Sequence, residues 1–325
     1  MHESWSPPGP FGKQALGTVT NGSSECPYDG RNPAVDTEEP YAMPPPRTQR
    51  PLHQQLVVTL YGLYAGKAGG SFRVAALVAM LADLGVDEQS ARSTVSRLKA
   101  KGTLLSRRDD GVARYVLSGD VLDIFNADDQ RIFAPERSRP EDPWALVVFS
   151  VPEAERNRRY ELRSELTSLG FGFVAAGVAI APSMVMDQAM ERLAARGLDR
   201  YTEYFSGDYL KGGDIRAQVP RWWDLELLDR QYSAFIDSYE SLARLWQERV
   251  QAGKLPSGAD RLEAFQTYVP MLTLWRKFPY RDPNLPLEYL PAGWQAPRAK
   301  QAFLTLHGIL RAPAEDHADE LLRTR

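Results

Sequence analysis

The chain has 325 residues, about twice the usual size of one domain, so two or three domains are expected. Hydrophobic residues make up 43% and charged residues 25%, and no apolar run is long enough for a membrane helix, so we expect no membrane partner. One cysteine and four histidines exclude multi-cysteine metal sites and leave few candidates for histidine catalysis. The first residues lack the pattern of a secretory signal, so we expect a cytoplasmic protein.

Residues 1–50 are predicted to form a disordered tail. They hold nine prolines and five glycines and show no sustained hydrophobic period. Such a segment cannot bury enough apolar surface to offset the entropy of ordering it. The first folded unit is therefore expected to begin at residue 51.

Residues 51–134 are expected to begin with three helices. Apolar residues recur at helical spacing after Pro51 and again over residues 74–84. The two stretches are separated by a short extended link at 71–73. A third helix is expected over residues 88–101 because an acidic N-cap precedes it and a glycine follows it.

A β-hairpin is expected to follow the third helix. Residues 103–108 and 112–117 are β-rich and flank an Asp-Gly turn at 110–111, which is typical of a hairpin. A linking helix is expected from residue 118 toward Phe133. Three short helices and a two-stranded hairpin together predict a winged helix-turn-helix.

The third helix carries the side chains that a DNA-binding helix requires. Ala91, Val95 and Leu98 recur at i, i+4 and i+7 and form its predicted inner face. The opposite face and the hairpin supply polar and basic side chains that can contact base edges or phosphates. These candidate DNA-binding residues are Gln89, Arg92, Ser93, Ser96, Arg97, Lys99, Lys101, Arg107, Arg108 and Arg114.

The charge distribution supports the same interpretation. Residues 51–118 hold nine cations and five anions, a net charge of +4, whereas the whole chain has a net charge of −3. The positive field is therefore local, as binding to DNA phosphates requires. The alternative is a solvated helix face on a winged-helix module that binds protein.

Residues 143–215 are expected to form a ferredoxin-like domain after a proline-rich, charged linker at 135–143. Strand and helix patterns alternate here within about 70 residues, which is typical of a small α+β sandwich. The expected elements are a strand at 144–151, a helix at 153–169, an apolar run at 171–181, a helix at 184–196 and a strand at 201–209.

Residues 216–312 are predicted to form a helical domain. Its helices are expected over 224–251, 260–277 and 298–311, with Pro270 kinking or breaking the second one. Five prolines make residues 278–297 largely irregular, and residues 313–325 are expected to be a flexible tail. The fold class is thus α+β and multidomain.

The segment around residue 278 contains a candidate ligand site. Trp275, Arg276, Lys277 and Arg281 combine three cations with aromatic neighbours in a proline-stiffened loop, which suits a ligand with phosphate and aryl groups. The alternative is a structural loop in which Arg281 and Asp282 satisfy backbone groups and cap helices. The sequence does not decide between the two.

Several strings, in order along the chain, resemble the PaaX family of bacterial transcriptional regulators, named for the repressor of phenylacetic acid degradation. The middle strings are also similar to the Cas2 proteins associated with CRISPR. The strings are LVVTLYG (56–62), LGVDEQ (84–89), RSTVSRL (92–98), WALVVFSV (144–151), LGFG (169–172), RKFP (276–279), RDP (281–283), LP (285–286) and LPAGW (290–294).

The resemblance implies a dimeric repressor that binds an operator of inverted half-sites in double-stranded DNA. It also implies release by an acyl-CoA thioester, which is phenylacetyl-CoA for the founding members, and hence control of an aromatic-acid catabolic operon. The third helix is then the recognition helix. No cofactor and no metal are expected.

The Cas2 resemblance suggests a rival class, a metal-dependent nuclease, and a CoA-thioester enzyme is a further alternative. The first strand ends at Ser150, where nuclease-active relatives place a carboxylate. A hydroxyl does not anchor magnesium as a carboxylate does. We therefore predict no catalytic residues, no enzyme activity, and a central domain that serves as a scaffold for homodimerisation.

Overall fold

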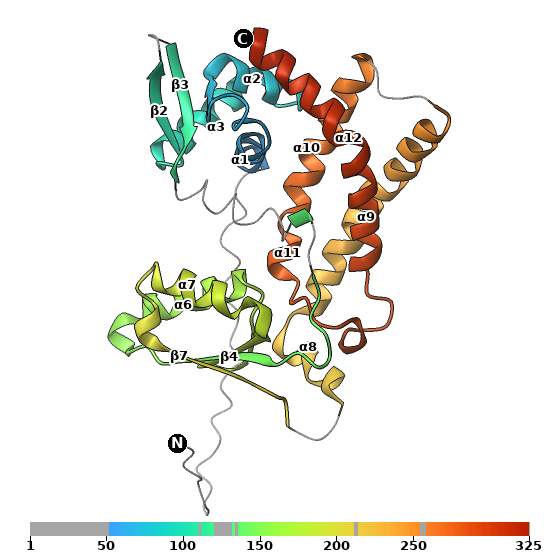
Figure 1. Cartoon of the computed structure of the whole chain (residues 1–325). Coiled ribbons are helices and arrows are strands. Elements are labelled where there is room, and N and C mark those ends of the chain that lie inside the picture. The colour runs from blue at the N-terminus through green and yellow to red at the C-terminus, as the bar shows by residue number, and fades with distance from the viewer. Residues whose placement is uncertain are drawn as a thin grey trace, which may run out of the picture. The chain divides into compact units, whose positions relative to one another are not determined.

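The computed structural model describes residues 52–109, 112–119, 132–133, 136–210, 214–253 and 258–324 (Figure 1). The predicted tail at 1–50, the turn at 110–111 and most of the predicted linking helix lie outside these residues. Within them the chain is mixed α/β with a helical C-terminal region, as the sequence predicted. No helix in this part is both long and apolar enough to cross a membrane.

The described residues from 52 to 117 form three helices and a three-stranded antiparallel sheet of order β1-β3-β2. The link expected at residues 71–73 is a strand, because its backbone pairs with β3 from Ser71 opposite Val116 to Arg73 opposite Arg114. The elements are α1 (Leu52–Tyr64), β1 (Ser71–Arg73), α2 (Val74–Asp83), α3 (Glu88–Ala100), β2 (Leu104–Asp109) and β3 (Val112–Leu117).

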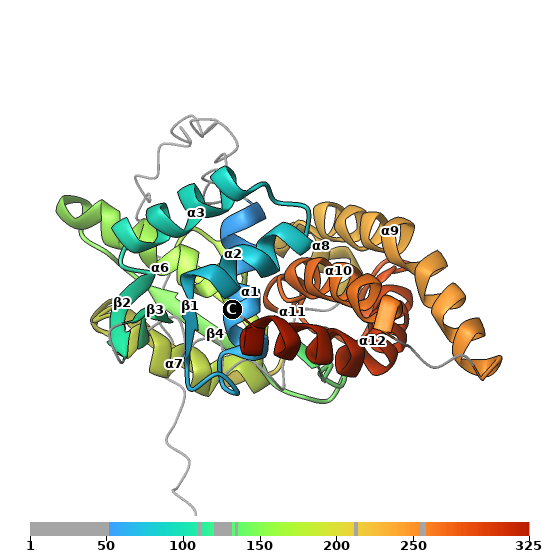
Figure 2. The ribbon, with the colours of Figure 1, turned by 90° about the horizontal axis from the view of Figure 1, so that it is seen from above.

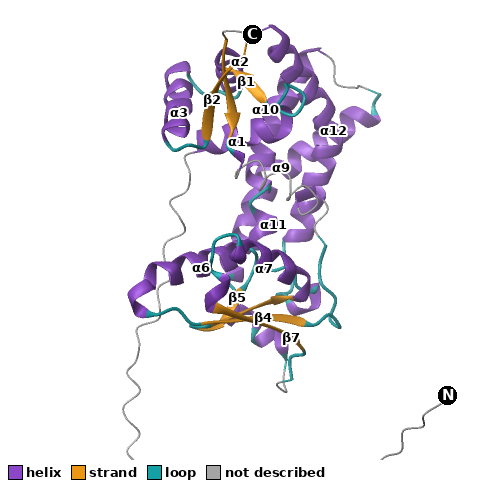
Figure 3. Cartoon of the chain, turned by 60° about the vertical axis from the view of Figure 1, so that its left-hand side comes forward, coloured by secondary structure: helices purple, strands orange, loops and turns teal. Residues whose placement is uncertain are grey.

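The central part has the element order β-α-β-β-α-β, and its strand order is β5-β6-β4-β7. Both helices, α6 and α7, lie on the same face of the sheet (Figure 3). Short 3₁₀ turns at Glu153–Glu155 and Ser183–Val185 precede them. The elements are β4 (Trp144–Phe149), α6 (Arg156–Ser168), β5 (Gly172–Ala175), β6 (Val178–Pro182), α7 (Met186–Ala194) and β7 (Thr202–Gly207).

The apolar run expected at 171–181 is not one strand but the hairpin of β5 and β6. Its turn passes close to β4, where a Cβ atom on Gly177 would lie 2.7 Å from the carbonyl oxygen of Phe149. Only glycine allows this approach, and the backbone N–H of Phe149 donates to the carbonyl of Gly177.

The C-terminal region is helical, with α9, α10 and α12 side by side (Figure 2). Pro270 was expected to kink or break this helix; it lies inside α10 without ending it, so the helix is not broken there. Residues 278–297 are largely irregular, as predicted, apart from a single helical turn and the 3₁₀ turn Leu287–Tyr289. The helices are α8 (Val219–Trp222), α9 (Leu225–Gln251), α10 (Gly258–Trp275), α11 (Phe278–Arg281) and α12 (Ala296–Thr324).

The last helix corrects the prediction of a flexible tail at residues 313–325. α12 continues through Pro313 to Thr324 and packs against α2 as well as α9 and α10. Ala314 and Ala318 are both 0% exposed, so the buried stripe of the helix continues in steps of four with small side chains. His317 adds a contact of 2.8 Å between its Nε2 and the Asp83 carboxylate at the end of α2.

The N-terminal part and the helical region share one hydrophobic core, whereas the sandwich of α6, α7 and their sheet has a second core. Polar contacts also join α10 to α1 and α2. The Thr273 hydroxyl lies 2.9 Å from that of Thr59, and both side chains are fully buried. Gln266 donates to the carbonyl oxygen of Asp83 at 2.8 Å.

Candidate nucleic-acid interface

The orientation of α3 follows from its own sequence. Asp87 caps the helix by accepting a hydrogen bond from the backbone N–H of Ser90 at 2.8 Å, and this bond lowers the pKa of the Asp87 carboxyl. The predicted inner face is buried, and Thr94, which was not predicted there, is buried with it. The remaining face of α3 is therefore directed to solvent.

The predicted recognition residues lie on this outward face. Arg92 pairs with Glu88 at 2.7 Å, and Arg97 donates to the Ser93 hydroxyl at 2.8 Å. Exposed pairs between neighbouring helical turns contribute little stability, so both arginines can turn to another partner at small cost. Gln89, Arg92, Ser96 and Arg97 are exposed and Ser93 is half-buried.

The basic side chains of the hairpin do not all point the same way. Strand residues alternate between the two faces of a sheet. Leu104 is buried against the helices, so Arg108 points to that side and Arg107 to the outer face. Arg114 is half-buried on the outer face and donates to the Ser71 hydroxyl at 3.4 Å. Lys99 and Lys101 remain exposed at the end of α3.

Arg73, which was not among the predicted contact residues, lies directly opposite Arg114 in the pairing of β1 with β3. The register of the hairpin itself places Arg107 on the other side of Arg114. The spacing within the hairpin could have predicted that Arg107 lies opposite Arg114. The position of Arg73 depends on a strand pairing between residues 41 positions apart, and the short sequence of β1 gives no local signal for it.

The structure corrects the prediction that Trp275 contacts a ligand. Its side chain is 2% exposed and its ring stacks on Phe303 at a centroid distance of 4.4 Å. The indole N–H donates to the carbonyl oxygen of Ile132 at 2.9 Å. All surfaces of this side chain are thus used by the core.

The three cations of the same segment lie together near the surface. Arg276 and Lys277 are half-buried and Arg281 is exposed. Burial, followed by the nearby charges of Arg281 and Arg276, lowers the pKa of Lys277. Among the described residues no carboxylate pairs with Lys277.

The alternative prediction for this segment was a structural loop in which Arg281 and Asp282 satisfy backbone groups. Asp282 has this role. Its buried carboxylate accepts from the backbone N–H of Asn284 at 2.8 Å, from the Tyr232 hydroxyl at 2.9 Å and from Arg137 at 2.9 Å. Arg281 instead reaches the Gln231 side chain at 3.2 Å. These hydrogen bonds of Asp282 hold the loop in place, and the three cations lie beside it in the chain.

The rival prediction of a nuclease site would need a carboxylate at the position of Ser150, which directly follows β4. The backbone N–H of Ser150 donates to the carbonyl oxygen of Tyr201 at 3.0 Å. Over the described ranges, no three His, Cys, Asp or Glu side chains are grouped closely enough to hold a metal ion.

Three family models match the chain in sequence order. They are described as PaaX-like protein, over residues 53–121; PaaX protein central Cas2-like domain, over 137–219; and PaaX-like protein C-terminal domain, over 223–320. The transcriptional repressor PaaX of Escherichia coli K12 is 26% identical over 258 residues, which cover 78% of each chain. A solved structure of an uncharacterized Mycobacterium tuberculosis protein, Rv0674, is 20% identical and gives a TM-score of 0.45, over 81% of this chain and 97% of that one.

Proposed function

Because the chain belongs to the PaaX family, we propose that it is a cytoplasmic transcriptional repressor that binds double-stranded operator DNA through α3. The observation that carries this proposal is the outward face of α3, where polar and basic side chains stand over a buried apolar face. Such a helix can enter a major groove and hydrogen-bond base edges.

The N-terminal part is then a winged helix-turn-helix, with α3 as the recognition helix and β2 and β3 as the wing. The order of three helices and the sheet β1-β3-β2 supports this assignment. Lys99, Lys101 and Arg108 are exposed and available to the phosphate backbone. Arg107 and Arg114 have the least support as DNA contacts, because they lie on the outer face of the sheet and point away from the helices.

The central domain is proposed as the dimerisation scaffold. The sheet face that α6 and α7 leave uncovered exposes Phe205 (55%) and Val148 (38%). Exposed apolar side chains of this size on one sheet face favour contact with a second copy. A homodimer would present two copies of α3 to inverted half-sites spaced about 34 Å apart or a multiple of that distance.

The effector is proposed to be an acyl-CoA thioester, with phenylacetyl-CoA as the first candidate and an aromatic-acid catabolic operon as the target. Arg276, Lys277 and Arg281 would bind its phosphates. Arg276 is also within 3.5 Å of the Thr59 hydroxyl on α1, so a ligand at the cluster would act on a contact between α10 and the DNA-binding part. Release requires that the ligand bind one arrangement of the dimer more tightly than the other.

The rival enzyme functions find less support. Ser150 stands at the position where a nuclease would need a carboxylate, and the curated relative is named as a repressor. Incubating the protein with duplex DNA and magnesium, and separately with phenylacetyl-CoA, would test both alternatives. Turnover that disappears in a single-residue variant would favour an enzyme.

The main test is fluorescence anisotropy with DNA from the region upstream of the protein's own gene, with and without phenylacetyl-CoA. We expect specific binding that weakens steeply with salt and is reversed by the thioester. Arg281→Ala should bind the same DNA but need more thioester for release. Failure to prefer this region over unrelated DNA would contradict the repressor assignment.

The dimer has a test of its own. Phe205→Asp places a charge on the uncovered sheet face and should give a monomer by size-exclusion chromatography with light scattering. A dimer that persists in this variant would move the interface elsewhere.

A further inference from the structure

A row of three arginines crosses the outer face of the N-terminal sheet. Arg73 of β1 lies opposite Arg114 of β3, and Arg107 of β2 lies opposite Arg114 on its other side. Side chains in directly opposed positions share a face, and like charges there are destabilising. An anion between the guanidinium groups would remove this repulsion.

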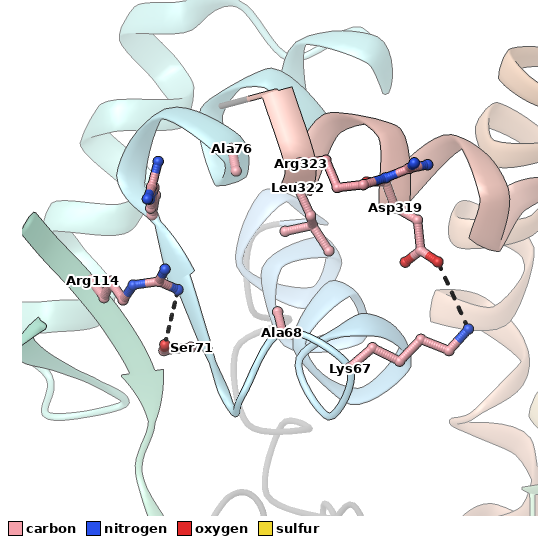
Figure 4. Close-up of a pocket in the computed structure, with 9 residues that line it drawn as sticks. Lys67, Ala68, Ser71, Ala76, Arg114, Asp319, Leu322 and Arg323 are labelled. Carbon is pink, nitrogen blue, oxygen red and sulfur yellow. Dashed lines mark hydrogen bonds and ion pairs between the residues drawn. The ribbon is translucent and has the colours of Figure 1, made fainter.

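A cavity of about 380 Å³ lies beside two of these arginines. Figure 4 shows Arg114 and Ser71 on one side of the hollow and residues from the end of α12 on the other. The charged and apolar groups that matter for binding are Lys67, Arg73, Arg114, Asp319, Leu322 and Arg323.

The charges around the cavity do not cancel. The Lys67 ammonium lies 2.5 Å from the Glu315 carboxylate and 3.8 Å from that of Asp319, so it offsets one of these two negative charges and the arginines around the cavity outnumber the charge that is left. Neither Arg73 nor Arg323 has a carboxylate partner in the described part of the chain. The cavity therefore keeps an excess of positive charge.

The first turn of α2 adds to this field. The helix begins at Val74, directly after Arg73, and no side chain caps its N-terminus. Ala76 of the same turn lines the cavity. Backbone N–H groups at a helix N-terminus favour an anion nearby.

We propose that this cavity binds the phosphate groups of a small anionic molecule, held by Arg73, Arg114 and Arg323. Guanidinium groups suit phosphate because they donate two parallel hydrogen bonds. A small molecule is favoured over the DNA backbone because the end of α12 closes one side of the hollow and Leu322 gives it an apolar wall. Its volume lies at the lower end of the usual range for small-molecule sites.

The site is distinct from the Arg276 cluster and does not rest on the proposed repressor function. A ligand bound here would join β1 and β3 to the end of α12. It would thus hold the sheet of the DNA-binding part against the C-terminal helix.

Isothermal titration calorimetry of the full chain with inorganic pyrophosphate, in low-chloride buffer and without DNA, tests the proposal. We expect saturable binding that Arg73→Ala and Arg323→Ala each weaken about tenfold or more. Arg230→Ala is the matched control, because Arg230 is an exposed arginine of α9 that does not line the cavity. Binding in this variant should be unchanged.

Thermal melting separates binding from loss of fold. Pyrophosphate should raise the melting temperature of the wild type but not that of Arg323→Ala, a change at the exposed end of α12. Absence of saturable binding, or equal weakening in Arg230→Ala, would overturn the proposal. Loss of operator affinity in Arg73→Ala, with no pyrophosphate binding by the wild type, would assign the arginines to DNA instead.

Discussion

Replacing Arg97 by alanine tests the recognition helix most directly. In the free protein the Arg97 guanidinium donates to the Ser93 hydroxyl, at 2.8 and 3.3 Å, and the side chain is exposed. Its loss should therefore change the free energy of unfolding by no more than about 0.5 kcal/mol. In a complex with operator DNA, loss of a bidentate contact to guanine costs about 1–3 kcal/mol. The dissociation constant should thus rise about 5- to 160-fold.

The assay is fluorescence anisotropy with operator and with unrelated duplex DNA over a range of salt. A base contact predicts weaker binding to the operator alone, whereas a phosphate contact predicts weaker binding to both and a salt slope reduced by about 1. Arg230→Ala is a suitable control, since Arg230 is similarly exposed and pairs with Glu226 at 3.6 Å on α9. Unchanged affinity in Arg97→Ala, or the same loss in Arg230→Ala, would refute the assignment of α3.

Three further predictions concern the packing and charge of other regions. Gly172→Ala would place a Cβ atom 2.6 Å from the Trp223 ring and should cost about 1–3 kcal/mol in urea unfolding, whereas Gly207→Ala, with no atom within 4 Å, should have little effect. Ala318→Leu overfills a fully buried position on α12 and should also lower the unfolding free energy by about 1–3 kcal/mol; wild-type stability would mean that this end of α12 is not packed. Because the pKa of Lys277 is lowered on folding, the folded state binds fewer protons than the unfolded state between the lowered and the usual pKa, and stability should rise with pH across that window. Lys277→Met should abolish this rise and melt at a higher temperature than the wild type at pH 7, and equal pH slopes for the two proteins would contradict the burial of that charge.

Elements defined by local signals were predicted well. The expected helix over 88–101 is observed at Glu88–Ala100, because its cap and its apolar spacing both lie within the segment. The hairpin was predicted for the same reason, since β-rich runs around a tight turn determine their own pairing. The outward face of α3 follows from these elements and needs no tertiary information.

Features that depend on distant partners were not predictable. The strand character of residues 71–73 arises only from pairing with β3. The last helix was expected to end at residue 311 and a tail to begin at 313, whereas the buried face of α12 continues through Ala314 and Ala318, which give a weak hydrophobic signal. Trp275 was mispredicted for a similar reason. The same sequence pattern, an aromatic residue beside cations, occurs whether the ring contacts a ligand or packs in the core, as it does here.

The length of α12 gives it the geometry of a lever. Its 29 residues span roughly 43 Å, so a tilt of about 5° at one end displaces the other by roughly 4 Å. Its first turn is tied to α9 by the contact of 2.6 Å between Arg298 and Glu240, and its last turns touch α2. A tilt too small to disturb packing among the C-terminal helices would therefore displace the end of α12 beside the DNA-binding part. That displacement would exceed the change in distance that a hydrogen bond to a base can tolerate.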